Sequence, residues 1–184
     1  PAVQGAMLDQ FPSRVLSVQF ADGTTWQPPP PTERQVFSAE TSHLVLDMLA
    51  DPEARRPAFG HDLPLDLPLP VAAKTGTSRG FADTVAVAVT REVTVAAWAG
   101  NFDGAATSGV VGMEGAAPLA RAGLVLAMAG KPWTLPDAPQ GLETHEVCPL
   151  SGLVRGPHCP GGKRELQRVG EVAAECTWHR ADAL

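Results

Sequence analysis

The residues with the clearest capacity for chemistry are four consecutive ones, Lys74, Thr75, Gly76 and Thr77. The lysine ammonium is a compact positive charge and the threonine hydroxyls are hydrogen-bond donors, which together suit the binding of a carboxylate. Gly76 has no Cβ, so a ligand backbone can approach closely there. We predict that these four residues bind the acidic end of a peptide substrate. Lys74 and Thr77 are also the predicted catalytic residues, because the backbone N–H of Thr77 can donate to an oxyanion during acyl transfer.

A second set of reactive side chains lies near the end of the chain. Cys148, Cys159 and Cys176 are the only cysteines, and His179 follows the last of them by three positions. Three thiols and an imidazole suit a tetrahedral zinc ion, although the spacing of the first two cysteines is not that of a standard zinc knuckle. An odd number of cysteines also fits one disulfide plus a free thiol. We interpret His158, beside Cys159, as a loop residue rather than a ligand.

Three strands are expected to position the lysine set. Residues 71–78, 83–90 and 93–99 predict an antiparallel meander with short turns, and the lysine set lies on its first strand. A peptide can add to an exposed sheet edge as an extra strand. Strict alternation places Thr75 and Thr77 on the opposite face from Lys74, so all three reach one ligand only if that strand is twisted. The competing interpretation is a surface strand with a solvated lysine.

A helix is expected to cover one face of this meander. Ala86 and Ala88 alternate with valines, and small residues on one face predict a closely packed helix there. Residues 113–129 are the apolar segment that fits, and Pro118 predicts the first helical position. A helix of this composition is expected to be buried on most sides.

The first seventy residues predict three further features. Residues 13–26 indicate a hairpin around Asp22-Gly23, and Ser38 is the predicted N-cap of a helix that ends at Asp51-Pro52. Residues 52–70 are interpreted as a proline-rich loop. The fold class is therefore α+β, with an antiparallel sheet covered by helices. Its divisions are residues 1–130, a linker over 131–146, and a small cysteine-containing module over 147–184.

Composition limits the function classes. The net charge is −6, which argues against a nucleic-acid partner because phosphate binding needs a concentrated basic surface. Only three lysines are present, so Lys74 calls for a specific explanation. There is no run of eighteen apolar residues and no signal peptide, which leaves the compartment open.

Several stretches of the chain resemble the class A penicillin-binding proteins, and within them the penicillin-binding protein 1C subfamily. The lysine-threonine-glycine triplet belongs, with S-x-x-K and S-D-N, to the signature of penicillin-binding serine acyltransferases. The resemblance covers nearly the whole chain in order and spacing. Its stretches are DPEARRPAFG (51–60), VAAKTGTSRGFAD (71–83), WAGNFDG (98–104), GAAPLARAG (115–123), VCPLSGLVRGPHCP (147–160) and CTWH (176–179).

The resemblance implies a DD-transpeptidase that cross-links peptidoglycan stem peptides through an acyl-serine intermediate and is trapped by β-lactams. It implies that the chain is the C-terminal half of such a domain, in a membrane-anchored parent on the periplasmic face of the bacterial inner membrane. An oxidising periplasm favours a Cys148–Cys159 disulfide over zinc, so no cofactor is expected. A cell-wall protein is a candidate partner for the tail.

The nucleophile of that family is not found in this sequence. None of the seven serines has a lysine three residues later, and Asn101, the only asparagine, has no serine two positions before it. The expected partner is therefore an upstream half of the domain that carries the serine, and the 184 residues alone should not form an acyl-enzyme. Two alternatives stay open: a non-catalytic cell-wall binding or interaction module, and a β-lactamase-like hydrolase, which the cysteine-bearing tail disfavours.

Overall fold

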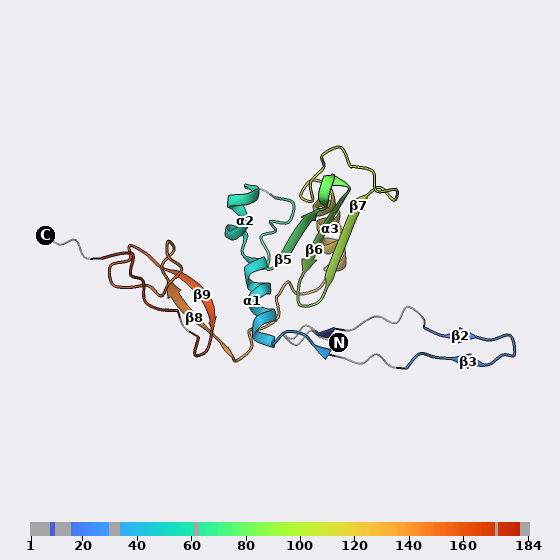
Figure 1. Ribbon diagram of the computed structural model, residues 1–184, viewed down its shortest axis with the longest axis horizontal. Helices are drawn as coiled ribbons and strands as arrows, with labels where there is room; N and C mark the ends of the chain where they lie inside the picture. The colour runs from blue at the N-terminus through green and yellow to red at the C-terminus, as the bar shows by residue number, and fades with distance from the viewer. Residues whose placement is uncertain (1–7, 10–15, 30–33, 61–62, 172, 181–184) are drawn as a thin grey trace.

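The structure, a computed structural model, describes residues 8–9, 16–29, 34–60, 63–171 and 173–180 (Figure 1). It combines helices with small antiparallel sheets, which confirms the α+β fold class. The elements are β1 (Leu8–Asp9), β2 (Val18–Gln19), β3 (Thr25–Trp26), β4 (Arg34–Gln35), α1 (Ala39–Ala50), α2 (Pro52–Phe59), β5 (Ala72–Thr77), the 3₁₀ turn η1 (Arg79–Phe81), β6 (Asp83–Val89), β7 (Thr94–Gly100), α3 (Ala116–Ala127), β8 (Leu142–Val147) and β9 (Lys163–Arg168).

The central sheet is the predicted meander. Its strand order is β5-β6-β7, and both pairs are antiparallel. In this register Lys74 lies opposite Val87, while Thr75 lies opposite Ala86. The lysine set is therefore on a strand at the margin of the sheet, as the sequence predicted.

Helix α3 covers the alanine face of this sheet. Ala86 and Ala88 are completely buried there, together with Leu124 of the helix. Small side chains let the helix backbone approach the strands closely, which confirms the packing inferred from the alternation.

Two details of α3 differ from the prediction. The helix begins at Ala116, so Pro118 is its third residue, where a backbone N–H would still lack an intrahelical acceptor. The opposite face is not buried, because Leu126 is 79% exposed and Leu119 and Val125 are exposed as well. Within the described part of the chain, no helix combines the length and the apolar character that crossing a bilayer requires.

Helix α1 begins as predicted but is followed by a helix that was not predicted. Ser38 caps α1, and its Oγ accepts a hydrogen bond from the Thr41 N–H at 3.2 Å. Asp51 ends α1 and also caps α2, because its Oδ1 accepts from the Glu53 N–H at 2.8 Å. The predicted loop over 52–70 is therefore wrong for residues 52–59. Proline at the first position of a helix is favourable, so Asp51-Pro52 is a start signal as well as a stop signal.

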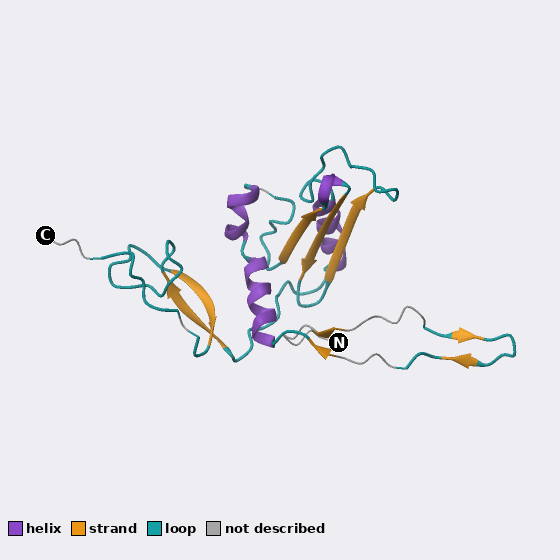
Figure 2. Cartoon of the chain, in the orientation of Figure 1, coloured by secondary structure: helices purple, strands orange, loops and turns teal. Residues whose placement is uncertain are grey.

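The predicted hairpin forms as β2 and β3, which are paired antiparallel. At its turn the carboxylate of Asp22 accepts from the Thr24 N–H at 2.9 Å, and Gly23 has a φ of +86°, a conformation that glycine adopts without strain. Residues 13–15 of that prediction lie outside the described residues. Figure 2 shows the hairpin extending away from the helices and the central sheet.

The C-terminal module is built on the two-stranded sheet of β8 and β9, with Leu142 opposite Arg168. Strand β8 begins inside the segment predicted as a linker over residues 131–146, so that prediction fails from residue 142 onward. The sequence around β8 has no short hairpin turn that would indicate a strand, because its partner β9 lies about twenty residues further along the chain.

The module rests against α1 at both ends of that helix. Lys163 at the start of β9 forms a salt bridge with Asp51 at 3.0 Å, and Arg168 at its end donates to Thr41 and lies 3.5 Å from the Ser38 Oγ. The helix and the strand are similar in length, since twelve helical residues span about 18 Å and six strand residues about 20 Å.

The buried face of α3 gives a test of the fold. Leu124→Ala should lower the free energy of unfolding by about 2–5 kcal/mol, because it leaves a cavity against the sheet. Leu126→Ala, the same change on the exposed face of the same helix, should alter it by less than about 0.5 kcal/mol. Urea denaturation followed by circular dichroism measures both, and equal losses would contradict the packing described for α3.

Candidate functional site

The lysine set occupies an open sheet margin. Strand β5 pairs with β6 on one side, and no other described strand pairs with its outer side. In Figure 1 this margin is the one that faces α1 and α2. Lys74, Gly76 and Thr77 are exposed, whereas Thr75 is 9% exposed. No described strand therefore occupies this edge, although α1 contacts β5 and the Thr75 carbonyl accepts from Lys74.

A cavity of about 230 Å³ lies between this margin and the helices. Lys74 and Thr75 line it from β5, while Met48 and Leu49 line it from α1. Arg55 of α2 also borders it. The cavity thus combines apolar walls with two cationic side chains, which is the composition of a small-ligand site.

The two cations differ in how they are neutralised. Arg55 forms a salt bridge with Asp66 at 3.0 Å, and its other terminal nitrogen donates to the Leu49 carbonyl at 2.7 Å. The Lys74 ammonium donates only to the carbonyl of Thr75, and no carboxylate pairs with it among the residues the structure describes. Lys74 is therefore the charge at this cavity that can accept an anionic ligand.

The alternation along β5 separates the two threonines from the face of Lys74. Thr75 lies opposite the buried Ala86, on the side that α3 covers. The Thr77 Oγ1 accepts a hydrogen bond from the Gly112 N–H at 2.9 Å, and its own hydrogen can still be donated to a ligand. Thr75 nevertheless lines the same cavity as Lys74, and Lys74, Gly76 and Thr77 are the exposed members of the set.

Two glycines at this margin have opposite steric roles. A Cβ on Gly76 would meet no atom within 4 Å, and its φ is not positive, so the chain itself does not require glycine there. A Cβ on Gly112 would lie 2.7 Å from the Gly76 carbonyl oxygen and 3.1 Å from the Thr75 Cβ. Gly112 was missed in the sequence, because a loop glycine 35 residues away from the strand carries no local signal of that contact.

The turn after β5 fixes the end of the margin. The Ser78 Oγ accepts from the Asp83 N–H at 2.7 Å, and the Ser78 N–H donates to the Asp83 carbonyl at 2.9 Å. The indole N–H of Trp98 on β7 donates to the Asp83 carboxylate at 3.1 Å. These hydrogen bonds connect the start of β6 with the end of β5 and with β7, and they hold Thr77 in place.

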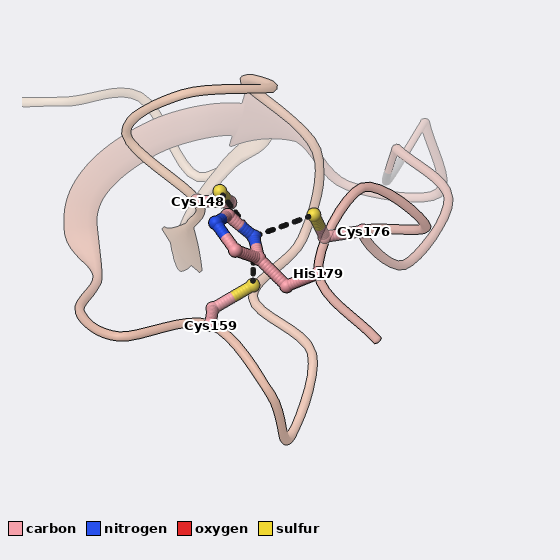
Figure 3. A group of neighbouring side chains, drawn as sticks. All are labelled: Cys148, Cys159, Cys176 and His179. Carbon is pink, nitrogen blue, oxygen red and sulfur yellow. Dashed lines mark hydrogen bonds between the residues drawn. The ribbon is translucent and has the colours of Figure 1, made fainter. Parts of the chain in front are cut away.

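The second predicted set converges at one point in the C-terminal module (Figure 3). The Nδ1 of His179 lies 3.6 Å from the Sγ of Cys148, 3.5 Å from that of Cys159 and 3.5 Å from that of Cys176. All four ligand atoms lie within 4.8 Å of one another. All three cysteines are buried free thiols, so the favoured Cys148–Cys159 disulfide is not present. His158 is exposed and outside the cluster, in agreement with its assignment to a loop.

Hydrogen bonds favour charged sulfur in this cluster. The Ser151 hydroxyl donates to the Cys176 Sγ at 3.2 Å, and this bond together with the His179 backbone N–H lowers the pKa of the Cys176 thiol to about 5. The Ser151 backbone N–H lowers the pKa of Cys148, whereas burial raises the pKa of Cys159. Ser151 was missed in the sequence, although it follows Cys148 by the same three positions that separate Cys176 from His179.

Comparison with known proteins shows which fold the chain has. No protein-family model and no curated protein matches the chain. Among solved structures, the chain resembles the crystal structure of penicillin-binding protein 1A from Haemophilus influenzae, with a TM-score of 0.62 and 20% identity over 79% of this chain. The fold is that of part of a penicillin-binding protein. The chain spans 22% of the length of that protein, so the activity of the whole is a matter for proposal.

The contrast between the two glycines predicts different effects of the same substitution. Gly112→Ala should lower the free energy of unfolding by about 1–3 kcal/mol, because a backbone carbonyl cannot move aside easily. Gly76→Ala should change it by no more than about 1 kcal/mol, in either direction, since the added methyl has open space. Thermal denaturation of the two variants checks this, and a Gly76→Ala variant as unstable as Gly112→Ala would refute the steric argument.

Proposed function

We propose that the chain is part of a peptidoglycan DD-transpeptidase and supplies the strand that holds the substrate carboxylate. The observation that carries the proposal is the margin of β5, where no other described strand pairs and no described carboxylate bonds to Lys74, close to a glycine that the fold does not require. The likeness of the fold to a penicillin-binding protein supports it. The residues 147–160 and 176–179 support assignment to the 1C subfamily, whose site of action is the periplasm.

In this role a stem peptide adds along the outer edge of β5. Its main chain hydrogen-bonds to the strand, and its terminal carboxylate meets the ammonium of Lys74. Gly76 leaves room for the peptide backbone, because no atom of the described residues lies within 4 Å of the place where its Cβ would be. The backbone N–H of Thr77 then donates to the carbonyl oxygen of the penultimate D-alanine, where negative charge develops during attack.

The reaction requires a serine from outside these 184 residues. Its Oγ attacks the penultimate D-alanine carbonyl, the terminal D-alanine leaves, and an acyl-serine ester remains. The amine of a neighbouring stem peptide attacks this ester. The new amide bond is the cross-link, and the serine is released. A β-lactam follows the first step only, because its ring-opened carbonyl stays on the serine. Its carboxylate is the group that Lys74 would hold.

Labelling by a fluorescent penicillin tests the role of Lys74. In the longer polypeptide that also contains an S-x-x-K serine, Lys74→Ala should slow acylation about 10- to 100-fold, since a hydrogen bond to a charged group contributes about 1.5–3 kcal/mol. Lys131→Ala, which removes an exposed lysine after α3, is the matched control and should label at the normal rate. Full labelling of Lys74→Ala would favour a non-catalytic binding module, and labelling of the 184 residues alone would show that the nucleophile lies within them.

A larger side chain at Gly76 tests the approach of the peptide. Gly76→Val should abolish or strongly reduce penicillin labelling of the same polypeptide while leaving its melting temperature nearly unchanged, because the valine fills ligand space rather than protein space. Acylation rate and thermal denaturation are measured on one preparation. Normal acylation combined with a large loss of melting temperature would show that Gly76 is needed for folding and not for binding the peptide.

A further inference from the structure

The C-terminal module has almost no hydrophobic core. Among its described residues, the buried cluster consists of Cys148, Cys159 and Cys176, with Leu153 packed partly against it. A unit of about forty residues rarely buries enough apolar surface to fold alone, and units of this size usually depend on disulfides or a metal ion. A disulfide or a metal ion is therefore expected at the centre of the module, and the side chains found there are cysteine thiols.

The geometry of the cluster fits a metal ion better than a disulfide. A tetrahedral zinc ion with Zn–S bonds of about 2.3 Å and a Zn–N bond of about 2.0–2.1 Å requires sulfur–nitrogen separations of about 3.6 Å. The three separations from the His179 Nδ1 are 3.6, 3.5 and 3.5 Å. A disulfide would bring two sulfurs to about 2.0 Å and would leave the third thiol and the imidazole without a function.

Backbone hydrogen bonds bring the segments that carry the ligands together. The Cys148 N–H donates to the Leu153 carbonyl at 2.7 Å, and the Gly152 N–H returns to the Cys148 carbonyl at 2.9 Å, which closes a tight loop. The Cys176 N–H donates to the Val154 carbonyl at 2.8 Å, so the segment with Cys176 and His179 lies beside that loop. The Ser151 hydroxyl, directed at the Cys176 sulfur, is the kind of outer hydrogen bond that orients a metal ligand.

We propose that Cys148, Cys159, Cys176 and His179 bind one zinc ion, which serves as the core of the C-terminal module. Three sulfur ligands and one imidazole form a closed tetrahedral set with no position left for water, so the site is structural and not catalytic. The cysteines bind as thiolates, and their protons pass to solvent when the ion enters. The bound ion also shields the thiols from oxidation.

Metal analysis of the purified chain, produced without a histidine tag in zinc-containing medium, tests this proposal. We expect one zinc per chain by elemental analysis and native mass spectrometry, with all three thiols reduced. Cys148→Ser, Cys176→Ser and His179→Gln should each lose most of the zinc. His158→Gln, next to Cys159 but outside the cluster, is the matched control and should keep it. A metal-free chain lighter by two hydrogens, stoichiometric iron or copper in place of zinc, or full zinc retention in His179→Gln would each overturn the proposal.

A measurement on the unaltered chain covers the case in which a ligand variant does not fold. Replacement of zinc by cobalt(II) should give the intense visible bands of tetrahedral cobalt thiolate, and added zinc should remove them. Chelation should expose the three thiols to a thiol reagent and disorder residues 142–180, while the β5-β6-β7 sheet keeps its amide resonances. A colourless cobalt sample with fully reactive thiols would refute the site. Penicillin labelling plays no part in these experiments, so either proposal can fail without the other.

Discussion

The packing of α3 on one face of the three-stranded sheet is the contact on which the rest of the structure depends. Ala86 and Ala88 have side chains so small that the helix lies close to the strands, and Leu124 fills the space between them. Because the helix stabilises the sheet from this side, β5 does not need a strand at its outer edge. The margin that carries Lys74 can therefore remain unpaired without the sheet losing its support.

The two candidate sites make opposite demands on the chain, and α1 connects them. In the proposed roles, the margin of β5 admits a ligand, whereas the cysteine cluster encloses an ion and excludes water. Helix α1 lines the cavity beside β5 with Met48 and Leu49, and its two ends are held by β9 of the module. The salt bridge of Lys163 with Asp51 is half exposed, so it contributes little stability by itself. The salt bridge instead positions β9 against Asp51, the residue at which α1 ends and α2 begins.

The sequence predicted those parts of the fold that depend on local patterns. Alternation revealed the meander and its alanine face, and Ser38 marked the start of α1. Helix α2 was missed because Asp51-Pro52 can end one helix and also begin another, and the neighbouring residues do not distinguish the two cases. The contact of Gly112 with β5 and the convergence of Cys148 with Cys176 join segments 28 or more residues apart, and spacing along the chain does not encode such distances. The preference for a Cys148–Cys159 disulfide depended on the expected compartment and not on geometry, and these cysteines are free thiols in the structure.

The hydrogen bond from the Lys74 ammonium to the carbonyl of its neighbour Thr75 has a kinetic consequence. The lysine has an acceptor in that carbonyl, so a carboxylate bound as proposed would replace a neutral partner by a charged one. The ammonium gives up its bond to the Thr75 carbonyl in this exchange, so the free energy gained is smaller than the full strength of an ion pair. In the proposed role, the ammonium returns to the Thr75 carbonyl when the carboxylate leaves, and this exchange favours release of the ligand.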